Sequence, residues 1–186
     1  MKRLFIATPT VFNSSYRDLI SKLRVKLSYD QIVWTDPSVS HLTLRFLGKT
    51  PDPVIPLLKE KLREVLSGTS SFSMEMDKIG VFGSRYAPSV LWAGFTEFES
   101  YRQLFEKVEK GIVSLGFEPA YGNFVPHITL GRIKKIDNKK RFWELMENNK
   151  PDFSQSIPIE NLTLFQSRLT PQGPLYTPLE VFSMKK

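Results

Sequence analysis

The same four-residue pattern, histidine–apolar–threonine–leucine, occurs twice in this chain, as HLTL at residues 41–44 and as HITL at residues 127–130. The two copies contain the only histidines of the 186-residue sequence, and almost half of the chain separates them. At ordinary residue frequencies, both histidines would fall into one repeated pattern by chance roughly once in 10^5 sequences. The repeat therefore predicts an internally duplicated fold, in which two equivalent strands face each other across a groove.

Short strands and helices alternate along the sequence, which indicates an α+β fold. Apolar residues in short runs bounded by Gly, Pro and Asp predict strands over residues 3–7, 32–34, 41–47, 72–81, 90–95, 124–133, 155–165 and 176–182. Apolar residues at helical spacing predict helices over residues 14–27, 54–66, 98–115 and 139–146. No stretch has the composition of a linker, so we expect residues 1–186 to form a single domain with two related halves.

Composition limits the class of protein. Hydrophobic residues make up 41% of the chain and charged residues 24%, as in ordinary globular proteins. The formal net charge of +7 favours a polyanionic partner such as nucleic acid. The absence of cysteine excludes disulfides and thiolate metal sites. No stretch has the length of a membrane span or of a signal-peptide core, so we expect a soluble, cytoplasmic protein with no membrane partner, and a monomer.

Alternation along a strand predicts which side chains of the motifs share a face. His41, Thr43 and Arg45 fall on one face of the first strand, and His127 and Thr129 fall on one face of the second. Two opposed histidines suit phosphoester cleavage by general acid–base catalysis, because a pKa of about 6.5 makes both ring forms accessible near neutrality. A threonine hydroxyl can donate a hydrogen bond to a non-bridging phosphate oxygen, where negative charge gathers.

Other interpretations of these residues compete with catalysis. Two histidines without cysteine or a nearby carboxylate cluster are a poor ligand set for a metal, so we expect neither a metal site nor another cofactor. The threonines could simply be favourable strand residues. Arg45 is either a phosphate ligand or a solvated or salt-bridged strand residue. Among the aromatic residues near the motifs, we expect Phe5 or Phe82 to stack on a nucleobase.

The motifs and their surroundings resemble the two-histidine (2H) phosphoesterase superfamily, and within it the RNA 2′,3′-cyclic phosphodiesterases, historically called 2′-5′ RNA ligases (LigT-like). The resemblance covers nearly the whole chain in the expected order, through RLFIA, HLTLRFLG, GVFGS, VLWAG, FVPHITLGR and LTLFQSRLTPQGPLY. It implies a bilobal α+β fold, with two pseudo-symmetric lobes of antiparallel sheet and flanking helices around a central cleft.

The same resemblance implies an activity and a role for each site residue. The activity is metal-independent hydrolysis of an RNA 2′,3′-cyclic phosphate end to a 2′-phosphomonoester. His41 would be the general acid toward the leaving 3′ oxygen, and His127 the general base toward water. Thr43 and Thr129 would hold the phosphate, and Arg132 would contact the phosphate or the ribose. Simple alternation points Arg132 away from His127, so a bulge or a strand end must reorient it.

The resemblance also implies RNA processing, with an RNA or oligonucleotide that ends in a 2′,3′-cyclic phosphate as the partner. Two alternatives remain open at this point. The fold could serve as an RNA-end binding module with incidental catalysis, or the substrate could be a 2′-5′-linked oligonucleotide or a small cyclic phosphate. The sequence contains no GxxxxGK[ST] phosphate-binding loop, so we expect no ATP site of that kind.

Overall fold

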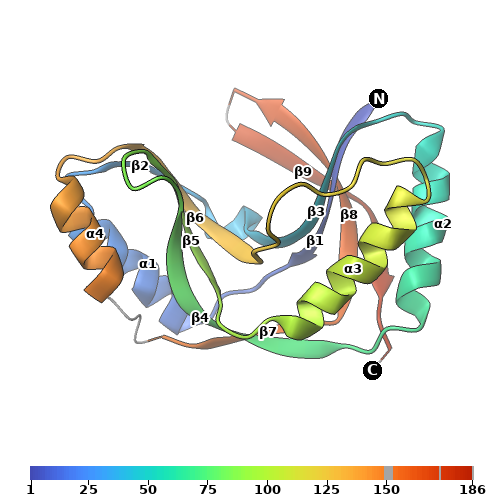
Figure 1. Ribbon diagram of the computed structural model, residues 1–186, viewed down its shortest axis with the longest axis horizontal. Helices are drawn as coiled ribbons and strands as arrows, with labels where there is room; N and C mark the ends of the chain where they lie inside the picture. Colours follow the sequence, from blue (N-terminus) through green and yellow to red (C-terminus); the bar gives the residue numbers. More distant parts are fainter. Residues whose placement is uncertain (149–152, 172, 186) are drawn as a thin grey trace.

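Two antiparallel sheets form the frame of the computed structural model, which describes residues 1–148, 153–171 and 173–185 (Figure 1). The first sheet has the strand order β3-β1-β8-β9, with β1 (Lys2–Pro9), β3 (His41–Thr50), β8 (Asn161–Thr170) and β9 (Gly173–Ser183). The second sheet has the order β2-β6-β5-β4-β7, with β2 (Gln31–Trp34), β4 (Phe72–Gly83), β5 (Pro88–Phe95), β6 (His127–Lys135) and β7 (Gln155–Ile159).

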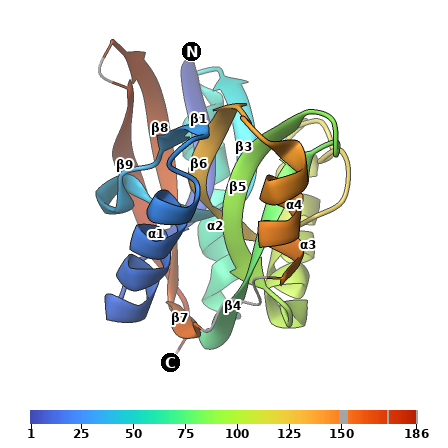
Figure 2. The ribbon, with the colours of Figure 1, turned by 90° about the vertical axis from the view of Figure 1, so that its left-hand side faces the viewer.

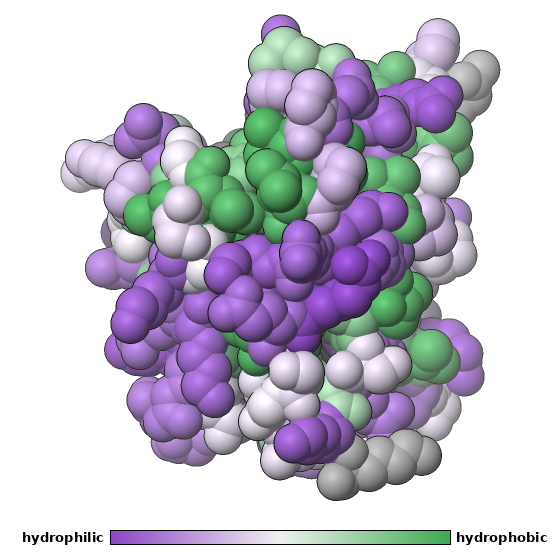
Figure 3. All heavy atoms as spheres, turned by 90° about the vertical axis from the view of Figure 1, so that its right-hand side faces the viewer, coloured by the Kyte–Doolittle hydropathy of each residue, from purple (hydrophilic) through white to green (hydrophobic). Residues whose placement is uncertain are grey.

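Helices cover the outer sides of the two sheets (Figures 1 and 2). They are α1 (Ser14–Lys26), α2 (Val54–Ser67), α3 (Glu99–Val113) and α4 (Lys139–Asn148), with a short 3-10 helix, η1 (Pro37–Val39). Each of the first three turns a stripe of residues three or four apart inward, such as Ile55, Leu58, Leu62 and Leu66 of α2. Hydrophilic side chains cover much of the outer surface on the side of α2 and α3 (Figure 3). None of the helices within the described ranges is long and apolar enough to cross a membrane.

The two lobes follow one connectivity. In the first, β1 precedes α1, β3 and α2, and in the second, β5 precedes α3, β6 and α4, while β1–β3 and β5–β6 are antiparallel neighbours. The chain leaves the first sheet after β1 so that α1 covers the second sheet, and it leaves the second sheet after β5 so that α3 packs on the first (Figure 1). This exchange interlocks the lobes, and it confirms the predicted bilobal α+β architecture.

Most predicted strands differ from the structure by a few residues at their ends, and two of the differences bear on the site. Residues 155–165 form two strands instead of one, because β7 pairs with β4 in the second sheet while β8, beyond Glu160, pairs with β1 in the first. Residues 124–126 are not part of a strand, and β6 begins only at His127. Pro126 precedes it and has no backbone N–H to donate to a strand ladder. The second motif therefore starts at a strand end, as the first does at His41.

Candidate active site

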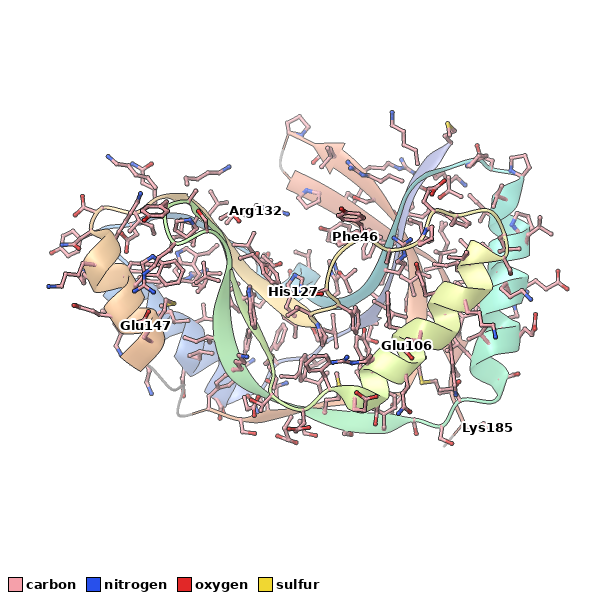
Figure 4. The ribbon with its side chains drawn as sticks, viewed as in Figure 1. Phe46, Glu106, His127, Arg132, Glu147 and Lys185 are labelled. Carbon is pink, nitrogen blue, oxygen red and sulfur yellow. The ribbon has the colours of Figure 1, made fainter. Side chains whose placement is uncertain are left out.

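The two motifs meet where the sheets approach each other. His41 is the first residue of β3 and His127 the first residue of β6, and these two strands are in contact. Thr43 and His127 line one hollow of about 200 Å³, and His127 lies between the two sheets in Figure 4. The charge of His127 also lowers the pKa of His41, so the two imidazoles interact electrostatically. The duplicated fold thus brings both histidines to one site.

The backbone holds both imidazole rings in the same way. Nδ1 of His41 lies 3.0 Å from the carbonyl oxygen of Val39, and Nδ1 of His127 lies 2.8 Å from the carbonyl oxygen of Val125. A carbonyl oxygen can only accept, so Nδ1 carries the hydrogen in each ring. Each Nε2 can therefore accept a proton when the ring is neutral and donate one when it is charged. The two motifs therefore share the orientation of the histidine ring as well as the sequence.

The surroundings lower the pKa of both histidines. Burial is the main cause in each case, because the charged ring loses hydration. The hydrogen bond from each ring to its backbone carbonyl opposes this effect, since it stabilises the charged form. At His41 the charge of His127 lowers the pKa further. A proton on His127 therefore makes protonation of His41 less favourable.

Aromatic side chains pack around each imidazole. His41 lies 4.8 Å from Phe5 and 5.0 Å from Tyr176, and His127 lies 4.7 Å from Phe82, between ring centroids. Phe5 is 2% exposed and lies among other rings, so it supports His41 and has no face open to a nucleobase, contrary to one of our expectations. Phe82 contacts His127 edge-on and is only partly exposed.

The Trp92 ring packs closely against the backbone of the neighbouring strand, beside His127. The Trp92 ring lies so near to Gly80 of the neighbouring strand that a Cβ added there would be 2.2 Å from a ring carbon. Only glycine admits a ring at that distance. The Trp92 ring in turn lies 6.3 Å from the His127 ring and 5.2 Å from Phe82. Gly80 therefore leaves room for the indole beside Phe82 and His127.

The motif threonines have hydroxyl groups that make no hydrogen bond to any other described residue. Thr43 and Thr129 are partly buried, two residues after His41 and His127 on the same strand faces. Within the described part of the chain, neither hydroxyl makes a hydrogen bond. Both remain available to donate to an anion placed between the histidines.

A bulge at the fourth position of each motif changes which later side chains face the site. In the first sheet the pairing with β1 skips Leu44, and in the second sheet the pairing with β5 skips Leu130. An unpaired residue reverses the alternation of faces beyond it. Arg132 thereby shares the face of His127, which confirms that a bulge reorients it. Phe46 holds the equivalent position in the first lobe, five residues after His41.

Phe46 and Arg132 approach the opening of the site from opposite lobes (Figure 4). Phe46 is 63% exposed, which is high for a phenylalanine, and Arg132 is exposed as well. Burial raises the pKa of Tyr176 in the first sheet, and the charge of Arg132 opposes this, so these two groups of opposite lobes interact electrostatically. Our sequence reasoning chose Phe5 and Phe82 over Phe46 as the base-stacking residue, although Phe46 follows His41 at the same spacing as Arg132 follows His127.

Arg45 is turned away from the motif face by the same bulge. Its Nε donates to Oε2 of Glu109 at 2.7 Å, and both terminal nitrogens donate to backbone carbonyls, one of them that of Glu118. The other oxygen of Glu109 accepts the N–H of Ala120. Arg45 and Glu109 therefore hold the loop that leads to the second motif. These contacts favour the interpretation of Arg45 as a salt-bridged strand residue, and its side chain also lines the hollow beside Thr43 and His127.

Comparison with known proteins assigns the chain to a family. A family model described as LigT-like phosphoesterase matches residues 11–92 and 97–176, which include both motifs. The chain belongs to the LigT-like phosphoesterase family. An RNA 2′,3′-cyclic phosphodiesterase of Methanothermobacter thermautotrophicus is 29% identical to it over 184 residues, or 98% of each chain. One from Aeropyrum pernix is 33% identical over 140 residues, or 75% of this chain and 78% of the relative.

The structural comparison agrees with the family assignment. A solved structure from Thermus thermophilus is 27% identical to this LigT-like phosphoesterase, covers 98% of both chains and has a TM-score of 0.79. The predicted family and the enzyme class, a hydrolase acting on phosphoesters, are confirmed by these matches. Within the described ranges, no group of three or more His, Cys, Asp or Glu side chains is placed to hold a metal ion.

Proposed function

We propose that this LigT-like phosphoesterase opens RNA 2′,3′-cyclic phosphate ends to 2′-phosphomonoesters by metal-independent acid–base catalysis. The observation that carries the proposal is the matched pair of Nδ1 hydrogen bonds to Val39 and Val125. These bonds leave Nε2 of each ring to accept or donate a proton. The hydroxyls of Thr43 and Thr129, which make no hydrogen bond among the described residues, lie on the same strand faces as the two rings. The names of the relatives from M. thermautotrophicus and A. pernix support the substrate class.

The proposed reaction uses one water molecule and exchanges the protonation states of the two rings. Nε2 of His127 takes a proton from water as the water oxygen attacks phosphorus. The bond from phosphorus to the 3′ oxygen breaks, and Nε2 of His41 donates its proton to that oxygen. Thr43 and Thr129 donate to the non-bridging oxygens, where negative charge increases in the transition state. Arg132 adds a guanidinium beside the phosphate or the ribose.

A product assay with chelator tests this function. Protein treated with EDTA should convert an oligoribonucleotide 2′,3′-cyclic phosphate to the 2′-phosphate, at the same rate as untreated protein, because two imidazoles supply both proton transfers. Product identity is read by chromatography against synthetic 2′- and 3′-phosphate standards. Loss of activity in EDTA with recovery on adding Zn²⁺ or Mn²⁺ would refute the metal-free mechanism. A 3′-phosphate product would mean that the bond from phosphorus to the 2′ oxygen breaks instead of the bond to the 3′ oxygen.

The pH profile should reflect the lowered pKa of both histidines. The base is active when neutral, and its lowered pKa keeps it neutral to more acidic pH. The acid is active when charged, and its lowered pKa means that it loses its proton, and activity falls, at a lower pH than for an ordinary histidine. We therefore expect a bell-shaped kcat/KM profile with its maximum below about pH 6.5. Bound phosphate stabilises the charged rings, so the basic limb of kcat should lie at higher pH than that of kcat/KM. A kcat/KM maximum above pH 7 would contradict this expectation.

A further inference from the structure

A row of exposed side chains continues from the site toward the far end of the first sheet. Phe5 contacts His41, so this face of β1 is the face of the site. Arg3 lies two residues from Phe5 on the same face, directly opposite Lys49 of β3, and both are exposed. Phe46, opposite Phe5, lies between this pair and the first motif. Two residues along a strand span roughly 6–7 Å. Along this face of the sheet, the histidine therefore comes first, the Phe46 ring next, and the Arg3–Lys49 pair last.

The Arg3–Lys49 pair carries positive charge that no ion pair with another described residue compensates. Like charges directly opposite each other on neighbouring strands destabilise a sheet. Neither side chain forms an ion pair within the described part of the chain, whereas the adjacent Lys2 lies 3.8 Å from Asp52. The other cation at the opening, Arg132, is likewise without an ion pair among the described residues, and its charge acts on Tyr176 of the first sheet. An anion bound at this end of the sheet would remove the repulsion.

We infer that Arg3 and Lys49 bind the phosphodiester on the 5′ side of the terminal nucleotide. This inference rests on the proposed function, which places the cyclic phosphate between the histidines. The terminal nucleoside then lies against Phe46, because unpaired bases stack on aromatic side chains. The next phosphate along the chain reaches Arg3 and Lys49, whose cationic groups suit it. The protein is accordingly specific for the ends of oligonucleotides rather than for cyclic mononucleotides.

Two substrates that differ only in the second phosphate test this subsite. Wild-type protein should have a kcat/KM about 10-fold higher for adenylyl-adenosine 2′,3′-cyclic phosphate than for adenosine 2′,3′-cyclic phosphate, as expected for a charge-assisted contact. The double variant Arg3→Gln/Lys49→Gln should lose this preference and keep its activity on the mononucleotide within about twofold. Its thermal midpoint should not fall, because the substitution removes a repulsive cross-strand contact.

A charge-matched control separates the subsite from general attraction of RNA. Lys22 and Lys107 are exposed on α1 and α3, and the variant Lys22→Gln/Lys107→Gln removes the same charge from the outer surface. It should keep the preference for the dinucleotide. Equal kcat/KM values for the two substrates in wild-type protein would overturn the inference. The inference would also be overturned if the control variant lost the preference for the dinucleotide as fully as the Arg3/Lys49 variant, or if the Arg3/Lys49 variant lost kcat/KM equally on both substrates.

Binding measurements keep the inference testable if the protein cleaves neither substrate, an outcome that would end only the proposed function. Calorimetric titration with the corresponding 2′-phosphate products needs no turnover. The dinucleotide product should bind about 10-fold more tightly than the mononucleotide product at 0.1 M salt, and only the Arg3/Lys49 variant should lose the difference. The salt dependence of dinucleotide binding should also be shallower in that variant. Equal affinities of wild-type protein for the two products would overturn the inference.

Discussion

His41→Ala and His127→Ala should each lower kcat/KM on a cyclic-phosphate dinucleotide by about 10²–10⁴-fold, because each removes one proton transfer from the step that breaks the ester. The double variant should lose much less than the product of the two single losses, since acid and base act together in one transition state. His→Asn variants provide the matched comparison. An asparagine amide can still donate to the backbone carbonyls of Val39 or Val125, yet it transfers no proton.

The outcome of these four variants separates packing from chemistry. Asparagine variants as impaired as the alanine variants would assign the loss to proton transfer, provided that circular dichroism shows both sets folded. Asparagine variants with wild-type turnover would instead mean that the rings serve only to hold the strand ends. Alanine variants with wild-type turnover would favour the alternative of an RNA-end binding module.

A change of leaving group assigns the two roles. A nitrophenyl phosphodiester leaves as a stable anion and needs no general acid, so it should partly rescue the variant that lacks the acid. The family resemblance implies rescue of His41→Ala and no rescue of His127→Ala. The charge of His127 also lowers the pKa of His41, so the reverse order is tested by the same experiment. Rescue of His127→Ala would exchange the two labels.

Periodicity predicted the α+β class and most elements because it depends only on neighbours along the chain. Alternation placed His41 with Thr43 and His127 with Thr129 correctly, as far as each strand stays regular. It failed beyond the fourth motif position, where each bulge depends on how β3 and β6 pair with β1 and β5. Arg45 was therefore assigned to the wrong face, while Arg132 was recognised as needing a bulge.

Long-range contacts account for the other differences. The break at Glu160 reflects which sheet each strand joins, and neither the apolar pattern before it nor the one after it contains that information. The partner of Arg45 is Glu109, 64 residues away in the sequence and on a helix that the chain exchanges between lobes. A single sequence shows that Arg45 carries a charge on a strand, but it does not show which carboxylate the fold brings to it.

Removing either motif hydroxyl should lower kcat by about 10–10³-fold with a smaller effect on KM, because a donor to a non-bridging oxygen gains most where charge develops. Thr43→Val and Thr129→Val keep the β-branched shape of the side chain and remove only the donor. Thr→Ser at the same positions keeps the donor and loses a methyl group, so the serine variants should retain most of the activity. Rates are measured with the dinucleotide substrate at saturation and at low concentration.

The two threonines need not contribute equally, and the comparison bears on the geometry of the site. Neither hydroxyl makes a hydrogen bond to the residues that the structure describes, so neither substitution breaks a hydrogen bond to that part of the protein, and the loss in rate measures contact with the substrate. A large loss at both positions would place the phosphate between the lobes, within reach of each strand. A loss confined to Thr43 would place it on the first lobe, beside Phe46 and the Arg3–Lys49 pair, with His127 acting only through water. Valine variants with full activity at both positions would show that the threonines are ordinary strand residues and that other groups hold the phosphate.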